Sequence, residues 1–211
     1  MSYAVKELFY SLQGEGRHAG RPAVFCRFTG CNLWSGREED RARAFCRVCD
    51  TDFVGTEGPG GGVYQAARDL AARVRLLWPV DSGAQPYVVC TGGEPLLQLD
   101  APLIAALHDA GFEVGLETNG TIAPPDGIDW ICVSPKAGTE LVARCGNELK
   151  LLYPQEGVDP SDYLNLAFGH FSLQPIDGRG LEVNTQLALR YCLKNPRWHL
   201  SLQIHKLLGI R

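Results

Sequence analysis

Three of the eight cysteines have the spacing of a metal-binding set. Cys31, Cys46 and Cys49 form the pattern C-x14-C-x2-C, and Cys26 precedes the first of them by five positions. Four thiolates would complete a tetrahedral zinc site, whereas three would hold a 4Fe-4S cubane with one iron open to an outside ligand. Cys26 lies inside the apolar run 23–28, where strand alternation turns its side chain away from Arg27 and towards a core. We therefore favour a three-cysteine iron-sulfur site, with a zinc-binding structural module as the alternative.

The other four cysteines are not grouped. Cys90, Cys132, Cys145 and Cys192 are far apart in the sequence, and the first two lie in apolar runs where cysteine behaves as a small hydrophobic residue. The chain starts without the apolar segment of a secretory signal, so reduced thiols are expected rather than disulfides. We expect these four side chains to be structural.

A glycine-rich turn with a carboxylate follows an apolar run at 87–90. The turn reads T-G-G-E-P at 91–95. Its two glycines allow the backbone to approach a ligand closely, and Glu94 offers a carboxylate to a cationic amine. Alone, the same sequence is also compatible with an ordinary turn and a proline helix start. Beside the three-cysteine loop, it favours a cofactor that carries an amine.

These motifs follow short apolar or β-branched runs that predict strands. The runs cover 23–28, 87–90, 113–117, 130–133, 148–153, 170–173 and 200–204. Helical spacing predicts helices at 63–77, at 101–110 after the cap Asp100, and at 184–194. Such alternation is typical of an α/β fold with a largely parallel sheet, whose sites form beyond the carboxyl ends of the strands. Because there are too few units for eight-stranded closure, we expect a partial, open (β/α) barrel as a single domain over residues 1–211.

The charge and hydropathy of the chain exclude some partners. A formal net charge of −4 gives no basic field for nucleic acid or anionic lipid. No run reaches the roughly 18 apolar residues of a membrane span. We expect a cytoplasmic protein that binds a small ligand, no nucleic acid and no membrane. The glycine-rich stretch 55–62 lacks the Lys-Ser/Thr of a phosphate loop, which predicts a mobile connector.

The pairing of a cysteine loop with Gly-Gly-Glu-Pro resembles the radical S-adenosylmethionine superfamily. The chain departs from the usual C-x3-C-x2-C of that superfamily by the insertion 32–45, and has Val48 where an aromatic residue commonly stands. The longer C-x14-C-x2-C loop resembles the 7-carboxy-7-deazaguanine synthases of queuosine precursor biosynthesis. This likeness runs over nearly the whole chain, through the motifs at 12–16, 25–28, 30–34, 49–51, 91–95, 117–120, 133–136, 147–150, 174–175 and 203–206.

The resemblance implies a (β/α) fold of the radical S-adenosylmethionine type with a modified cluster-binding loop, and a pterin substrate. The substrate would be 6-carboxy-5,6,7,8-tetrahydropterin, which has a guanine-like edge of donors and a carboxylate at the reacting end. Gln13 and Glu15 suit the first, and the planar fork of Arg27 suits the second. The full set implied for the substrate is Leu12, Gln13, Gly14, Glu15, Arg27, Thr91, His205 and Arg211. An ion pair on an edge strand is the alternative for Arg27.

The same resemblance implies three cofactors. Cys31, Cys46 and Cys49 would hold the 4Fe-4S cluster, and Thr51 would be the protein ligand of a Mg²⁺ that also reaches the substrate carboxylate. A turn hydroxyl is the alternative for Thr51. S-adenosyl-L-methionine would bind at Val48, Cys49, Asp50, Gly92, Gly93, Glu94, Glu117, Val133, Ser134, Pro135, Lys136, Gln174 and Pro175.

The implied reaction is a radical ring contraction. An electron from a flavodoxin-like donor would reduce the cluster, a 5′-deoxyadenosyl radical would take the hydrogen from substrate C6, and loss of ammonia would give 7-carboxy-7-deazaguanine. The cofactor carries this chemistry, so we assign no protein acid or base. The resemblance also suggests a homodimer.

An activase of glycyl-radical enzymes and an inactive regulatory member stay open as alternatives. Lys150 and His205 could be functional or structural, the charged segment 32–45 is expected to be a solvated helix, and the terminal carboxylate of Arg211 would close the pocket.

Overall fold

In the part of the chain that the structure describes, one mixed sheet of nine strands forms the centre of the molecule. The structure is a computed structural model that describes residues 2–79 and 83–211. The strand order is β3-β1-β2-β4-β5-β6-β7-β8-β9. The strands are β1 Tyr3–Leu12, β2 Pro22–Phe28, β3 Gly62–Tyr64, β4 Tyr87–Gly92, β5 Glu113–Thr118, β6 Trp130–Val133, β7 Cys145–Tyr153, β8 Ala167–Pro175 and β9 Trp198–Leu200. All pairs from β2 to β9 are parallel, while β1 pairs antiparallel with β2 and β3.

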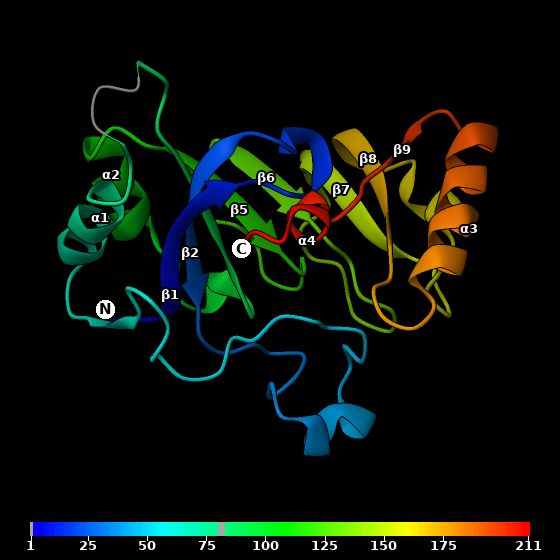
Figure 1. Cartoon of the computed structure of the whole chain (residues 1–211), viewed down its shortest axis with the longest axis horizontal. Coiled ribbons are helices and arrows are strands. Elements are labelled where there is room, and N and C mark those ends of the chain that lie inside the picture. The colour runs from blue at the N-terminus through cyan, green and yellow to red at the C-terminus, as the bar shows by residue number, and fades with distance from the viewer. Residues whose placement is uncertain (1, 80–82) are drawn as a thin grey trace.

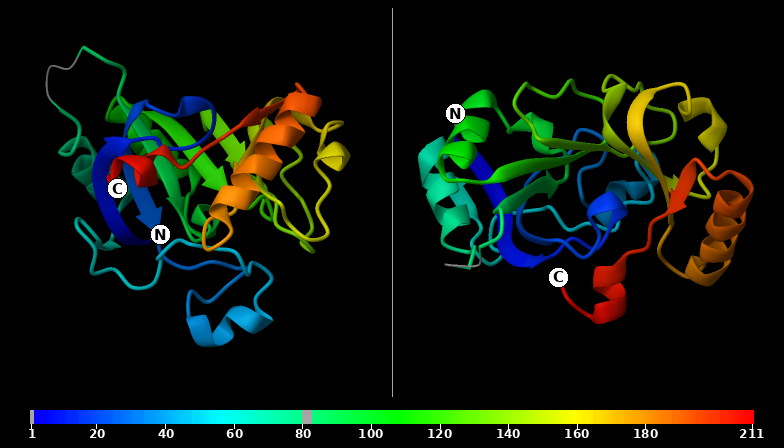
Figure 2. Two further views of the ribbon diagram at one scale, coloured as in Figure 1. Left: turned by 45° about the vertical axis from the view of Figure 1, so that its right-hand side comes forward. Right: turned by 90° about the horizontal axis from the view of Figure 1, so that it is seen from above.

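Because parallel neighbours need crossovers, helices cover the outer face of the sheet. These are α1 Ala67–Arg75, α2 Ala101–Asp109 and α3 Leu181–Lys194, and the short α4 Ile204–Leu208 follows β9. Figure 1 shows α1 and α2 at one end of the sheet, α3 at the other end, and α4 near its middle. The sheet curves, with β3 and β9 as its two edges (Figure 2). The prediction of a partial, open barrel is confirmed.

Local sequence explains the predicted helices that the structure contains. Asp100 caps α2 by accepting the Leu103 N–H at 3.0 Å, and the chain leaves the helix at Gly111, where φ is +86°. In α1, Leu70 and Val74 are one turn apart and both are buried in the main apolar core. Of the predicted 63–77 helix, the first part is wrong, because β3 occupies Gly62–Tyr64.

Other expectations also need correction. Strand β1 was not predicted, and the strand expected at 200–204 is wrong: β9 ends at Leu200 and α4 begins at Ile204. The stretch 55–62, expected to be a mobile connector, is bound to β1 by the Leu8 N–H on Pro59 O at 2.7 Å and the Gly58 N–H on Lys6 O at 3.1 Å.

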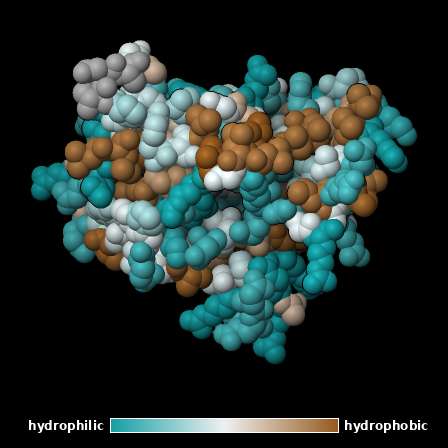
Figure 3. Space-filling model, viewed as in Figure 1, coloured by the Kyte–Doolittle hydropathy of each residue, from teal (hydrophilic) through white to brown (hydrophobic). Residues whose placement is uncertain are grey.

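The segment 32–45 contains one short 3₁₀ helix, η2 Glu38–Arg43, none of whose residues is buried. The segment lies below the sheet in Figure 1, and this part of the surface is mostly hydrophilic in Figure 3. A solvated helical element is thus confirmed, although it is shorter than the segment. Within residues 2–79 and 83–211, no helix has the length and apolar character needed to cross a bilayer.

Candidate active site

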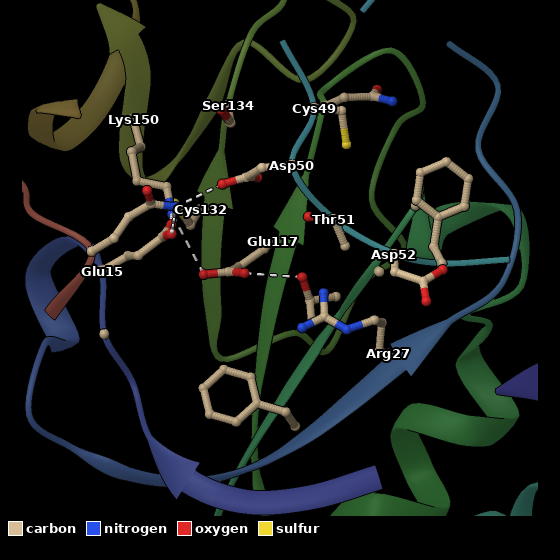
Figure 4. A pocket seen from close by; sticks show the side chains of 18 of the residues that line it. Glu15, Arg27, Cys49, Asp50, Thr51, Asp52, Glu117, Cys132, Ser134 and Lys150 are labelled. Atoms are coloured by element: carbon tan, nitrogen blue, oxygen red, sulfur yellow. Dashed lines mark hydrogen bonds and ion pairs between the residues drawn. The ribbon is translucent and has the colours of Figure 1, made fainter. Parts of the chain in front are cut away.

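A cavity of about 340 Å³ opens beyond the carboxyl ends of the parallel strands. This is the edge at which parallel α/β sheets form their sites. Most residues predicted for the site line it: Leu12, Gln13, Gly14, Glu15, Arg27, Cys31, Cys46, Val48, Cys49, Asp50, Thr51, Thr91, Gly92, Gly93, Glu117, Ser134, Lys136, Gln174, His205 and Arg211. Figure 4 shows Glu15 and Lys150 on one side of this pocket and Cys49 on another.

The three predicted cluster cysteines share a local backbone pattern. Cys31 Sγ accepts the N–H of Leu33 at 3.5 Å, Cys46 accepts the N–H of Val48, and Cys49 accepts the N–H of Thr51. Each sulfur thus receives a donor from the residue two positions further on. Such donors stabilise thiolate charge and are a recognised feature of iron-sulfur ligation.

Cys46 and Cys49 are also hydrogen-bonded to each other. The bond from Cys49 lowers the pKa of Cys46 to about 6 and raises that of Cys49, and burial raises the pKa of Cys31. Among the described residues, no three His, Cys, Asp or Glu side chains converge on one point where a single metal ion would bind. A cubane has a different requirement, because each cysteine sulfur binds a different iron.

Two further cysteines, Cys26 and Cys132, lie in strands. Cys26 is buried in the core, in register with Cys90 on β4, and burial raises the pKa of both. It does not line the cavity as described, so a zinc site completed by Cys26 is not supported. Cys132, expected to be structural, is buried in β6 and also lines the cavity. Its pKa is raised by burial.

Arg41 of the inserted segment braces the cysteine loop. Its guanidinium lies over the Trp34 ring at 4.0 Å and donates to the carbonyls of Arg47 and Cys49, both at 3.0 Å. Glu38 orients it with two further hydrogen bonds. Because a planar guanidinium can stack and donate at the same time, one residue ties η2 to the loop that carries two cluster thiols.

A buried charged group lies at the other end of the cavity. Lys150 Nζ donates to Glu15 Oε2 and lies 3.6 Å from Glu117 Oε1, while Gln13 Nε2 donates to Glu117 Oε1 at 3.1 Å. Burial opposes the charge on Glu15, but Lys150 outweighs it and lowers the Glu15 pKa to about 2. For Lys150, burial is likewise outweighed by Glu15 and Glu117, which raise its pKa. Both groups are therefore ionised at neutral pH.

Glu117 lies among the residues predicted for the substrate. It accepts the Thr91 hydroxyl at 3.0 Å in addition to the Gln13 amide. The sequence predicted that Glu117 binds S-adenosylmethionine. In the structure, Glu117 instead contacts Gln13, Thr91 and Lys150. Lys150, whose role was left open, is thereby placed in the site.

Arg27 makes the predicted ion pair and also lines the cavity. Its Nε donates to Glu7 Oε1 at 2.9 Å, and the side chain lines the cavity. Glu7 also accepts Arg211 Nη1 at 3.1 Å, so one carboxylate positions two arginines at the cavity wall. The described residues offer no further acceptor to the terminal nitrogens of Arg27, which leaves its planar fork for a ligand.

Glu94 differs from its predicted placement. It is 0% exposed and does not line the described cavity. Its carboxylate accepts the Thr118 hydroxyl and the Asn119 N–H, both at 2.8 Å, and the Leu96 N–H at 3.0 Å. Burial raises its pKa. These bonds make Glu94 a brace between the turn at 91–95 and the end of β5.

The remaining predicted residues that do not line the cavity are sequence neighbours of residues that do. Val133 and Pro135 enclose Ser134, and Pro175 follows Gln174 at the end of β8. Lys136 Nζ donates to Ser134 O at 2.5 Å and to Ser134 Oγ at 2.8 Å, and burial lowers its pKa. The Lys136 charge interacts electrostatically with Cys46 and Cys49, so Lys136 lies near these two thiols.

The C-terminal segment supplies contacts that sequence reasoning missed. Gln203 Nε2 donates to Glu15 Oε1 at 3.0 Å and to Asp50 Oδ2 at 3.2 Å, and Lys206 Nζ bridges Asp50 and Asp177 at 2.5 and 2.6 Å. His205 fits against Gly14, where a Cβ would be 2.1 Å from the ring. The motif at 203–206 signalled that the segment matters, but only the fold shows its partners.

An open, mostly parallel sheet, three thiols in a loop beyond β2 and a glycine turn beyond β4 define an α/β enzyme of the radical S-adenosylmethionine class. No protein-family model matches the chain. It is 63% identical to the 7-carboxy-7-deazaguanine synthase of Bradyrhizobium diazoefficiens and 59% identical to that of Burkholderia multivorans, in each case over the full length of both proteins. The crystal structure of QueE from Escherichia coli is similar, with a TM-score of 0.72, 27% identity and coverage of 97% of this chain and 95% of that one. The chain belongs to the 7-carboxy-7-deazaguanine synthase family.

Proposed function

We propose that this chain converts 6-carboxy-5,6,7,8-tetrahydropterin to 7-carboxy-7-deazaguanine with release of ammonia. The observation that carries the proposal is one cavity with two chemically different ends. Three thiols supported by backbone donors lie at one end, and a buried Glu15–Lys150–Glu117 group lies at the other. The names of the relatives, which are full-length matches, agree with this chemistry.

The thiol end fits a 4Fe-4S cluster. Cys31, Cys46 and Cys49 would each bind one iron, which leaves the fourth iron for S-adenosylmethionine. The backbone turns at 91–93 and the wall of Ser134 and Lys136 are adjacent lining, so they would receive the methionine and nucleoside parts. When bound, the cluster and S-adenosylmethionine would supply the carbon radical that takes a hydrogen from substrate C6.

The charged end fits a guanine-like edge. Glu15 and Glu117 offer two carboxylates against one lysine, and Gln13 offers an amide. This excess of acceptors suits a ligand with N–H donors. The residues here bind and orient the pterin, and their burial excludes water from the ring.

The pterin carboxylate would face Arg27, whose Nε is already fixed by Glu7. Thr51 lines the same cavity and supplies a hydroxyl oxygen, which suits Mg²⁺ together with water and substrate oxygens. Arg211 and His205 would complete the pterin pocket from the C-terminal side. A flavodoxin-like donor and a homodimer complete the proposal as predictions from the family.

Anaerobic reconstitution with iron and sulfide tests the reaction. The reconstituted protein is incubated with the carboxypterin, S-adenosylmethionine, Mg²⁺ and dithionite, and the products are separated by chromatography. We expect 7-carboxy-7-deazaguanine, ammonia and a brown protein. Reductive cleavage of S-adenosylmethionine without the deazaguanine would indicate a different radical enzyme, such as an activase. A protein that cleaves neither compound would be an inactive member.

A further inference from the structure

Glu148 on β7 is a buried carboxyl group that the proposed reaction does not use. It is 2% exposed, and it belongs to the motif at 147–150. Its two oxygens accept the same backbone N–H of Arg17, at 3.1 and 3.0 Å, and its Oε1 also accepts the Ser172 hydroxyl at 2.6 Å. Burying a carboxyl group costs free energy unless hydrogen-bond donors satisfy its oxygens. The groups that supply these donors therefore indicate what Glu148 does.

The contacts hold the turn that follows β1. At Gly16 φ is +65°, and a Cβ there would be 2.7 Å from both Glu148 oxygens, so only glycine lets the carboxyl group approach. The Gly16 N–H donates to Ser201 Oγ at 2.8 Å, and Ser201 in turn donates to Gln174 Oε1 at 3.1 Å. The backbone at 16–17 is thus fixed by Glu148 of β7 and by Ser201, the residue after β9. Gln174 of β8 in turn holds Ser201.

The same turn carries Gln13 and Glu15 into the cavity. Lys150 lies two residues beyond Glu148, so strand alternation places both side chains on one face of β7. Glu148 holds the backbone of the turn, while Lys150 holds the Glu15 carboxylate. One strand therefore fixes both the path of the turn and the direction of its charged side chain.

We infer that Glu148 is a positioning residue for recognition of the pterin ring. It acts through the 13–17 turn, and this inference rests on the proposed function. Hydrogen bonds to a planar ring depend on placement to within a fraction of an ångström, so freeing the turn weakens the ring contacts of Gln13 and Glu15. The cluster thiols come from a different loop and keep their geometry.

The test compares Glu148→Ala with Glu148→Gln in the reconstituted holoenzyme. For Glu148→Ala we expect the KM for the carboxypterin to rise about tenfold or more, with an unchanged KM for S-adenosylmethionine. Glutamine retains one oxygen for Arg17 and Ser172, so Glu148→Gln should recover most of the loss. Iron content, the EPR spectrum of the reduced cluster and the rate of S-adenosylmethionine cleavage without pterin should match those of the wild type.

A matched control is Glu113→Gln. Glu113 on β5 accepts two hydrogen bonds from Arg21, at 3.1 and 2.6 Å, and does not line the main cavity. This change removes a partly buried carboxylate from another strand, so it should leave the KM for the carboxypterin unchanged. If Glu148→Ala does not fold, Ser172→Ala and Gly16→Ala perturb the same contact and should raise that KM selectively.

Two results would overturn the inference. One is a folded Glu148→Ala enzyme with both KM values unchanged, and the other is a parallel change of both KM values, cleavage rate and iron content. Failure of the proposed function is separate, because it would appear as absence of the deazaguanine product from the wild-type enzyme.

Discussion

Lys150 is one cation between two carboxylates at a closed end of the cavity. Its side chain is 7% exposed, and those of Glu15 and Glu117 are 17% and 25% exposed. The Glu15 pKa is far below neutrality, and one lysine faces two carboxyl groups, so hydrogen-bond acceptors outnumber donors at this end of the cavity. Ligand N–H groups would satisfy the remaining acceptor capacity, which predicts a preference for a ligand with a donor-rich edge.

The Glu15–Lys150 pair predicts a specific pH dependence of stability. Folding lowers the Glu15 pKa from 4.5 to about 2, so its stabilisation is complete above about pH 4.5 and is lost as the pH falls towards 2. A shift of this size corresponds to about 3 kcal/mol. The free energy of unfolding of the wild type minus that of Glu15→Gln, measured in urea from pH 6 to pH 2, should decrease by about this amount. A difference that stays constant over this range would contradict the assignment.

A second prediction at this scale separates the cysteines. After anaerobic reconstitution, Cys46→Ser should lose most of its iron and visible absorbance, because the cubane loses one of three protein ligands. Cys26→Ser is the matched control, and it should retain both, since Cys26 lies in the core beside Cys90. Iron and sulfide analysis with absorbance spectra measures this. Equal loss in both variants would support a four-cysteine site instead.

Residue types revealed part of the site before the fold was known. The chemistry of some residues could be predicted from residue type and spacing, as for Cys31, Gln13 and Arg27. The contacts of Gln203 and Lys206 could not be predicted in that way, because their partners Glu15 and Asp50 are more than 150 positions away in the sequence. The position of Cys132 at the cavity was not predicted, because an apolar run does not reveal which face of a strand meets a cavity.

At the scale of elements, the end of β4 comes unusually close to the loop after β2. At Gly92 φ is +132°, and a Cβ there would be 2.3 Å from Phe28 O. At Gly93 a Cβ would be 2.0 Å from Gly30 O. The two glycines therefore bring the turn at 91–95 against the start of the cysteine loop. They also leave the backbone of the turn at the cavity wall.

Gly92→Ala should therefore separate two elements of the site. We expect loss of about 2 to 4 kcal/mol of stability, or a displaced turn, because both the dihedral angle and the contact disfavour a Cβ. Gly169→Ala is the control within β8, where a Cβ would lie 3.4 Å from Asn147 O and φ is not in the left-handed region. Urea unfolding of both variants measures the difference. Equal stability of the two variants would show that the turn relaxes without cost.

Elements with strong local signals were predicted, and elements defined by their partners were not. Strands β4, β5 and β6 are apolar runs buried on both faces, as in parallel sheets generally. Strand β1 contains Lys6, Glu7 and Ser11 because it is a peripheral antiparallel strand that also forms a cavity wall, and that mixture hides it. The run 200–204 is apolar enough for a strand, yet the Ile204 N–H is bonded to Gly14 O, which draws the chain away from the sheet.

At the scale of the whole molecule, the C-terminal residue returns to strand β1 at the rim of the cavity. Ser11 Oγ donates to Arg211 O at 2.6 Å, and Arg211 donates to Glu7. In Figure 1 the C-terminus and α4 lie near the middle of the sheet, beside β1. No residue of α4 is buried, and Leu207 and Leu208 are 73% and 59% exposed. Polar contacts at the rim therefore hold this segment, rather than an apolar core of its own.

Segment 203–211 should consequently unfold locally more readily than the sheet. Lys206 should be the residue that contributes most to holding it in place. In Lys206→Met, we expect faster amide hydrogen exchange in residues 203–211, because the bridge to Asp50 and Asp177 is lost. The free energy of unfolding should change by less than about 1 kcal/mol, since the lysine is 38% exposed. Lys194→Met, at the exposed end of α3, is the matched control and should exchange like the wild type there. High salt should bring the wild type towards the variant, because screening weakens the same ion pairs. Exchange that is insensitive to both the substitution and salt would show that other contacts, such as the Ile204 N–H on Gly14 O and the Ser11 hydroxyl on Arg211 O, keep the segment closed.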